Sequence, residues 1–575
     1  MSRGAQTKQQ LAKRFVARTA LVLSFFGLAA AALVARAVYL QVLNKDFLNQ
    51  QADTRHLRTE TISAHRGTIT DRHGEPLAIS TPVDSIWANP KEVAADVDRL
   101  PQLAAALEVD AQSLMRRVTR AMDKEFVYLK RHLSPEQAHR AMALGLPGVN
   151  IQREYRRYYP AGEVTGHLVG FTNIDDDGQE GLELAFNHWL AGEEGSKRVL
   201  KDRLGRSVEN VESIRPPRPG KELRTSVDLR LQYVAYRTLK GAIQKFNADS
   251  GSIVVLDVET GEVLAMANQP SYNPNDRSQY SAERYRNRAI TDIFEPGSSI
   301  KPLIVAAALE SGQYRPSSIV DTSPGYVVVG PKKIEDTRDL GRVSLTTVLS
   351  RSSNVGVTKV GLSLEPDQLW STMTRFGLGA LTTSGFPGES AGLLTHYNHW
   401  KPISQATLAY GYGVSVTPLQ LAQAYAALGG DGVVRPVSLI STQTSVEGQR
   451  ILTSDTARAV RRMLEEVVRP GGTGMKASVN GYRIAGKTGT AWKFAAGGYS
   501  EDEYFSVFAG LAPASKPKLA TVVIIDEPKG ELYYGSDVAA PVFSKVMTES
   551  LRLLAVPPDA LPARDAGSIL QAMTQ

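Results

Sequence analysis

The chain contains no cysteine. That absence excludes a disulfide scaffold, a cysteine nucleophile, iron–sulfur clusters and cysteine-ligated zinc. It does not identify the redox compartment, because a chain without thiols is equally safe in an oxidising or a reducing one. The sequence also lacks an HExxH pattern and carboxylates at ligand spacing beside its histidines, so we expect no metal and no other cofactor.

A strong charge excess and low-complexity stretches are also missing. Hydrophobic residues make up 42% and charged residues 22% of the 575 residues, which predicts packed cores rather than a disordered chain. The formal net charge is +7, and the first eighteen residues carry five basic residues and no acidic one. Because no basic stripe lies on a predicted folded domain, we expect no nucleic acid partner.

One long apolar run is present near the N-terminus. Residues 19–35 are uncharged, and the apolar character continues to Leu40. About 20 helical residues span a ~30 Å hydrocarbon core, and Arg18 and Arg36 can extend to its two interfaces. Since the basic flank precedes the run, we predict a single-pass membrane anchor with a cytoplasmic N-terminus and the remainder of the chain on the other side of the membrane.

Two other interpretations of this run are open. A cleaved signal peptide would use the small-x-small pattern at residues 35–37, although the run is long for such a segment and Arg36 lies inside the site. A buried core helix is the second, and the basic flank argues against it. The anchor is therefore favoured.

Downstream, the Pro-rich segment 215–220 predicts a domain boundary, and the region before it has a mixed character with helical stretches at 101–107 and 135–144. Beyond the boundary, a predicted hairpin and three later strands enclose about 200 mainly helical residues. This order predicts an α+β domain with an antiparallel sheet. The predicted strands are 251–258, 262–267, 482–490, 504–511 and 519–526.

The most informative segment is EPGSSIKP at residues 295–302, followed by an apolar helical run. Ser298 would begin that helix, where free N–H groups and the dipole stabilise negative charge. Lys301 lies one turn further on the same face. A lysine amine kept neutral by burial or nearby cations can accept the proton of a serine hydroxyl, which is otherwise a poor nucleophile.

The S-x-x-K pattern alone is weak, because Ser515–Lys518 also matches it, with Pro517 inside and a predicted strand following. S-x-N occurs three times, at 271–273, 352–354 and 478–480, whereas K-T-G occurs once, at 487–489. Order and spacing select one series: Ser298, then 352–354 about fifty residues later, then Lys487 on a strand. That series is similar to the motifs of penicillin-binding proteins and serine β-lactamases.

Other segments narrow this resemblance. HRGTITDRHG (65–74), RYYPAG (157–162) and GLE (181–183) resemble three boxes of the N-terminal module of class B penicillin-binding proteins. TLAYGYG (407–413) and YYG (533–535) are similar to the septal, cell-division branch of that class. The resemblance covers essentially the whole chain except its two tips.

The resemblance implies a fold and a domain order. The expected catalytic domain is α+β, with a five-stranded antiparallel sheet between two helical groups, and an elongated N-terminal pedestal module for dimerisation or partner binding precedes it. The expected segments are a cytoplasmic tail (1–18), a transmembrane anchor (19–40), the pedestal (41–222), the transpeptidase domain (223–555) and a flexible tail (556–575).

The resemblance also implies residue roles. Ser298 would attack the penultimate D-Ala carbonyl of a peptidoglycan stem peptide, with Lys301 as general base. Ser352 and Asn354 would relay protons and hydrogen-bond substrate, and Lys487 would add positive charge. The expected substrate-binding residues are Ser353, Thr488, Gly489 and Thr490; the N–H groups of Ser298 and Thr490 would form the oxyanion hole. Relatives can carry Arg where this chain has Trp492.

The implied function is a D,D-transpeptidase that cross-links septal peptidoglycan. Implied partners are stem peptides, β-lactam antibiotics bound covalently at Ser298, the inner membrane, and a polytopic glycosyltransferase with other division proteins on the N-terminal module. Two alternatives remain: a hydrolase using the same acyl-enzyme (a D,D-carboxypeptidase or β-lactamase), and a division scaffold. We expect structural ion pairs for Arg66, Arg157 and Glu295.

Overall fold

The structure, a computed structural model, describes residues 3–45, 57–201, 207–442, 446–495 and 498–560. The chain forms two compact units. Unit 1 comprises 1–64, 82–154 and 193–218, and unit 2 comprises 65–81, 155–192 and 219–575. The chain passes into the last part of unit 2 inside the Pro-rich segment, after Arg218. The five segment limits given above stay predictions, and most of the predicted tail lies outside the described residues.

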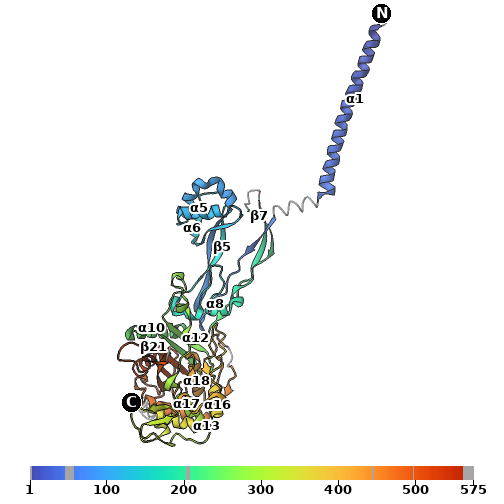
Figure 1. Cartoon of the computed structure of the whole chain (residues 1–575). Coiled ribbons are helices and arrows are strands. Elements are labelled where there is room, and N and C mark those ends of the chain that lie inside the picture. Colours follow the sequence, from blue (N-terminus) through green and yellow to red (C-terminus); the bar gives the residue numbers. More distant parts are fainter. Residues whose placement is uncertain (1–2, 46–56, 202–206, 443–445, 496–497, 561–575) are drawn as a thin grey trace, which may run out of the picture. The chain divides into compact units, whose positions relative to one another are not determined.

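The N-terminal apolar run lies in one long helix, α1 (Arg3–Val38), which continues into a π-helical turn, η1 (Tyr39–Leu43) (Figure 1). The most apolar 18-residue window within Lys13–Val42 has a mean hydropathy of 2.1, and none of that window is buried. Phe25 and Leu28, for example, are exposed. A helix of this kind is not the core helix of a soluble domain, so that interpretation was wrong, and its length suits a membrane span.

Unit 1 contains a three-stranded sheet in the order β1-β6-β7 and a separate helical cluster around buried Leu103, Leu114 and Leu129. Both predicted helices are present, as α4 and α6. Asp110 and Ser134 cap α5 and α6 by accepting a hydrogen bond from a backbone N–H in the first turn. The elements are β1 (Leu57–Ile62), β6 (Gly195–Lys201), β7 (Ser207–Arg215), α3 (Pro90–Val93), α4 (Leu100–Ala106), α5 (Ala111–Arg120), β4 (Val127–Leu133) and α6 (Pro135–Met142).

The N-terminal segments of unit 2 are joined by a buried ionic network. Glu183, in α8 (Gly181–Ala185), accepts hydrogen bonds from Arg66 Nε at 2.7 Å and from Arg157 Nε at 2.6 Å. All three side chains are almost fully buried. A buried charge without its partner is strongly destabilising, so these pairs hold the three sequence boxes together. The structural role expected for both arginines is confirmed.

The rest of unit 2 is built on a five-stranded antiparallel sheet in the order β10-β9-β21-β20-β19. Its first hairpin and last three strands lie where the sequence predicts them. Helices α10 and α20 pack with one face of the strands, around Val255 and Val523, and α18 packs with the other, around Val254 and Val522. The elements are β9 (Ser250–Asp257), β10 (Val263–Gln269), β19 (Ala485–Ala495), β20 (Gly498–Ala512), β21 (Leu519–Asp526), α10 (Leu229–Phe246), α18 (Pro418–Gly429) and α20 (Ala539–Leu553).

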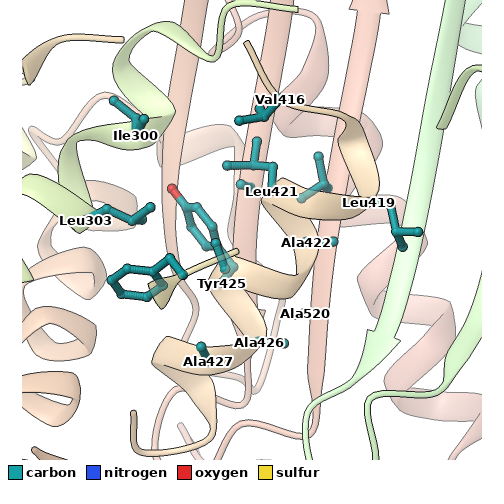
Figure 2. Close-up of a cluster of buried hydrophobic side chains, with 14 of the residues drawn as sticks. Ile300, Leu303, Val416, Leu419, Leu421, Ala422, Tyr425, Ala426, Ala427 and Ala520 are labelled. Atoms are coloured by element: carbon teal, nitrogen blue, oxygen red, sulfur yellow. The ribbon is translucent and has the colours of Figure 1, made fainter. Parts of the chain in front are cut away.

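Helix α18 is buried along its whole length and lies between the sheet and the helices that carry the catalytic motifs (Figure 2). A capping box of Thr417 and Gln420 starts it. Its Tyr425 donates a hydrogen bond to the carbonyl of Ser299 at 2.8 Å. This bond ties the core directly to the turn that carries Ser298. The helices around it are α13 (Lys301–Glu310), α14 (Leu345–Ser350), α15 (Asn354–Leu362), α16 (Pro366–Arg375), α17 (Pro402–Ala409) and α19 (Ser454–Val468).

Candidate active site

The turn that carries Ser298 is a short 3-10 helix, η5 (Gly297–Ile300), immediately before α13. The loop of the TLAYGYG motif supports it: Gly297 donates its N–H to the carbonyl of Gly411 at 3.1 Å. Gly411 has φ +95°, and a Cβ there would lie 2.0 Å from the Gly297 oxygen, so only glycine allows this approach. The Ser298 hydroxyl is half-exposed and has no hydrogen-bond partner among the described residues.

Lys301 is completely buried beside this turn. Its Nζ lies 2.6 Å from the Ser352 carbonyl, 2.7 Å from Asn354 Oδ1 and 3.2 Å from Ser352 Oγ. Burial, and then the positive charge of Lys487, lower the pKa of Lys301 well below its usual range. Both effects favour the neutral amine, which is the form that can accept a proton.

Lys487 reaches the same hydroxyl from strand β19. Its Nζ donates to Ser352 Oγ at 2.9 Å and to the Thr488 carbonyl at 3.1 Å. Burial lowers the pKa of Lys487 to about 7. Ser352 therefore connects two buried amines that repel each other when both are charged, and the three sequence motifs meet at one oxygen.

Ser352 adopts a left-handed backbone with φ +59°, a conformation that usually costs a non-glycine residue about 1–3 kcal/mol. The next residue holds it there. Ser353 is the N-cap of α15, and its Oγ accepts the Gly356 N–H at 2.8 Å. The hydroxyl of Ser353, a predicted substrate-binding residue, also donates its one proton to Asp336.

Asp336 is a site residue that the sequence did not reveal. It follows β13 (Lys332–Glu335), and its Oδ1 accepts the backbone N–H of Val355 at 3.0 Å and that of Asn354 at 2.5 Å. A carboxylate at a helix N-terminus is favourable for both the hydrogen bonds and the dipole. Asp336 thus fixes the start of α15 and with it Asn354. A lone aspartate sixteen residues before the S-x-N motif gives no signal of this contact.

Strand β19 contributes the other predicted substrate-binding residues. Thr490 Oγ1 accepts the N–H of Gly535 at 3.0 Å, and Thr488 Oγ1 lies 3.1 Å from Thr473 Oγ1. Gly489 allows close packing, because a Cβ there would lie 2.9 Å from the Pro296 carbonyl oxygen. Its small size lets β19 lie against the serine turn.

A cavity of about 570 Å³ opens over these residues. Of the predicted site residues, Ser298, Ser352, Ser353, Asn354, Thr488 and Thr490 line it. Lys301 and Lys487 lie behind the lining, fully buried. The remaining wall comes from residues 335–338, Leu340, Arg351, 471–473, Tyr534 and Ser536. Its volume suits a small extended ligand.

Glu295 forms no ion pair with any residue the structure describes, so the expected ion pair was wrong. Its Oε1 accepts the N–H of Gly413 at 2.6 Å and the hydroxyl of Tyr499 at 3.1 Å. Burial is the main cause that raises the pKa of Glu295. Neutral donors thus satisfy Oε1, whereas Oε2 is buried with no hydrogen-bond partner among the described residues.

The second S-x-x-K segment does not form a catalytic pair. Lys518 forms ion pairs with Asp257 at 3.0 Å and with Glu259 at 2.9 Å. Burial lowers the pKa of Lys518, but the hydrogen bond to Glu259 and the charge of Asp257 outweigh burial, so the pKa is raised. A charged lysine held by two carboxylates cannot act as a base. The choice of Ser298 over Ser515 thus has a physical basis.

Comparisons with known proteins agree with this geometry. Residues 251–548 match the family described as penicillin binding protein transpeptidase domain, and residues 61–225 match the penicillin-binding protein dimerisation domain. The chain is 45% identical to the peptidoglycan D,D-transpeptidase FtsI of Escherichia coli K12 over 553 residues, covering 95% of this chain and 94% of FtsI. It is 43% identical to a probable peptidoglycan D,D-transpeptidase, PbpC, of Pseudomonas aeruginosa over 544 residues, covering 95% and 96%.

Solved structures agree as well. The peptidoglycan synthetase of Bifidobacterium adolescentis superposes with a TM-score of 0.70 at 25% identity, covering 89% of this chain and 99% of that one. The transpeptidase domain of Burkholderia pseudomallei penicillin-binding protein 3 superposes with a TM-score of 0.54 at 40% identity, covering 58% and 97%. The predicted α+β transpeptidase fold with its N-terminal module is confirmed.

The first prediction concerns the pH dependence of Ser298 acylation by labelled penicillin. The rate should fall with decreasing pH as Lys301 gains a proton and ceases to be a base. Lys487→Met removes the neighbouring charge that lowers the pKa of Lys301. The acidic limb of the pH profile, where the acylation rate falls as the pH decreases, should therefore move to higher pH. Lys301→Met should lose about 10²–10⁴-fold in rate. An acidic limb unchanged in Lys487→Met would show that the two amines do not interact.

The second prediction concerns Asp336. Asp336→Asn should slow acylation by about tenfold or more, because displacing a positioned group by a fraction of an ångström is costly. The same change removes a negative charge that raises the pKa of Lys301, so the acidic limb should move to lower pH, opposite to Lys487→Met. Asp339→Asn is the matched control, since within the described residues the Asp339 side chain accepts a hydrogen bond from the nearby Gly341 N–H and from no other group. If Asp336→Asn and Asp339→Asn have the same acylation rate and the same acidic limb of the pH profile, the positioning role is refuted.

Proposed function

Because this chain belongs to the class B penicillin-binding proteins, we propose that it is a peptidoglycan D,D-transpeptidase that cross-links stem peptides through an acyl-enzyme on Ser298. The observation that carries this proposal is the shared contact of Lys301 and Lys487 on Ser352, beside a serine hydroxyl that is free to react. The similarity to the division transpeptidase FtsI favours a role in septal wall synthesis.

In the acylation step, Ser298 Oγ bonds to the penultimate D-Ala carbonyl carbon while the neutral amine of Lys301 takes the hydroxyl proton. The N–H groups of Ser298 and Thr490 would hold the developing oxyanion, which is worth about 3 kcal/mol per donor. The C–N bond then breaks, and the proton passes through Ser352 to the departing D-Ala amine. Charged Lys487 with the hydroxyls of Thr488 and Thr490 would bind the terminal carboxylate.

In the second step an amine of another stem peptide attacks the ester carbonyl. Lys301 takes the amine proton, the new amide forms as the ester C–O bond to Ser298 breaks, and Lys301 returns a proton to the Ser298 oxygen. A β-lactam follows only the first half, because its ring amide imitates D-Ala-D-Ala and its cleaved amine stays attached. That makes β-lactams covalent inhibitors at Ser298.

Three carboxylates near the site bear on the hydrolase alternative. Hydrolysis needs a base that activates water beside the ester, as an extra Glu does in class A β-lactamases. Glu295 is turned toward Gly413 and Tyr499 and does not line the cavity, and both Asp336 oxygens are engaged by α15 and its cap. Glu335 lines the cavity but is paired with Lys333. These engagements disfavour activation of water and favour transfer to an amine.

The location and partners of the chain are part of this proposal. Helix α1 would be a single-pass inner-membrane anchor, with basic residues 3–18 in the cytoplasm and the catalytic domain in the periplasm. A polytopic glycosyltransferase and other division proteins would bind the N-terminal module. The apolar, exposed α1 and the basic flank support the topology, and the FtsI similarity supports the division setting.

The third prediction tests the reaction. Labelled penicillin should attach to Ser298 alone, and Ser298→Ala should abolish labelling without unfolding the protein. With no acceptor amine present, the penicilloyl adduct should persist for many minutes to hours in intact-mass spectra. Peptide mapping of the label to Ser515 would overturn the site. Loss of the adduct within seconds, with steady release of penicilloic acid, would establish a β-lactamase instead.

The fourth prediction tests topology. The mature protein should keep its N-terminus and remain in the membrane fraction, and residues from about 57 onward should be open to protease added from the periplasmic side. N-terminal sequencing that begins near Val38 would instead establish a cleaved signal peptide.

A further inference from the structure

Two arginines on the wall of the catalytic cavity have no ionic partner. Arg338 and Arg351 line the same cavity as Ser298, and both are exposed. Within the described part of the chain, neither side chain forms a salt bridge or a hydrogen bond. They come from separate elements: Arg338 follows β13 closely, and Arg351 ends α14 immediately before Ser352.

The acidic residues of the same wall do not neutralise them. Glu335 is paired with Lys333, and Asp336 is occupied by the hydrogen bonds at the start of α15. The guanidinium groups therefore face the cavity without a counter-charge from its lining. A concave wall of one sign concentrates the field and attracts a ligand of opposite sign.

The terminal carboxylate of a stem peptide does not account for these arginines. The groups expected to hold it are the hydroxyls of Thr488 and Thr490, which line the cavity on β19, with the charge of Lys487 buried behind them. The two guanidinium groups belong to the opposite, helical side of the site, on the segments next to β13 and α14. They are left for a second anionic group of the ligand.

We propose that Arg338 and Arg351 bind a second carboxylate of the donor stem peptide, on a residue that precedes its D-Ala-D-Ala end. This inference rests on the proposed function. The acceptor must enter through the space that the leaving D-Ala vacates, next to Thr488 and Thr490. The donor, in contrast, stays attached to Ser298 through both steps, so contacts along the rest of the cavity act on the donor.

The chemistry of the two side chains suits this role. A guanidinium presents paired N–H donors that match a carboxylate, and its charge persists at all relevant pH values. The Arg351 guanidinium lies next to the backbone of Gly471, because its Nη2 is 3.2 Å from where a Cβ of Gly471 would be. The two arginines would thus select donors with an acidic residue near the cleaved end and would take no part in bond making.

A matched pair of synthetic pentapeptides ending in D-Ala-D-Ala tests the proposal. In one the third residue carries a free side-chain carboxylate, and in the other the same group is a carboxamide. Each peptide is used to slow the labelling of Ser298 by fluorescent penicillin in the full-length protein. The ratio of their half-inhibitory concentrations measures the preference for the carboxylate. A substitution that weakens the binding of both peptides equally leaves this ratio unchanged.

Wild-type protein should prefer the carboxylate by about tenfold or more, the usual scale for a hydrogen-bonded charge pair. In the double variant Arg338→Gln/Arg351→Gln the ratio should fall toward one. Arg462→Gln is the control: Arg462 is exposed on α19, outside the cavity, and should keep the wild-type ratio.

A ratio near one in the wild type, or a wild-type ratio in the double variant, would overturn the arginine site. If neither peptide competes while penicillin still acylates Ser298, the proposed stem-peptide substrate itself is wrong. The two failures therefore give different results.

Discussion

Two buried lysines share one hydroxyl, and the remainder of the site depends on that contact. Lys301 and Lys487 come from a helix and a strand 186 residues apart in sequence, and both reach Ser352 Oγ. Neither has a carboxylate hydrogen-bonded to its amine among the described residues, so burial and mutual repulsion keep one of them neutral. That neutral amine is the base, and the charged one is the anion-binding group.

Such an arrangement is costly, and the surrounding fold holds it in place. Ser352 needs a left-handed backbone, which Ser353 and Asp336 fix at the start of α15. Tyr425 of the central helix holds the serine turn, and β19 can approach that turn because residue 489 is glycine. Displacing any of these supports would move an amine away from its hydroxyl rather than remove a reacting group, so their effects should be on rate more than on folding.

Local sequence patterns predicted the features that depend on neighbouring residues, namely the strands and the three motifs. The positions of the five strands follow from apolar runs and turns, and the three motifs follow from fixed spacings around Ser298, Ser352 and Lys487. The positions of the remaining contacts are set by tertiary packing. Asp336 and the two cavity arginines lie in an irregular segment and at a helix end, where no periodicity marks them. Glu295 looked like an ion-pair partner by type, and only its surroundings of amide and phenol donors show otherwise.

The central claim is that the Lys301 amine is neutral at physiological pH because burial, and then the charge of Lys487, lower its pKa. Titration of the protein with carbon-13 at the lysine Cε positions measures this directly, with Lys301→Arg used to assign the resonance. The account predicts that Lys301 titrates far below the ordinary lysine value of about 10.4, and that Lys487→Met moves its midpoint upward. A Lys301 resonance that titrates near the ordinary value, with no response to Lys487→Met, would contradict the account.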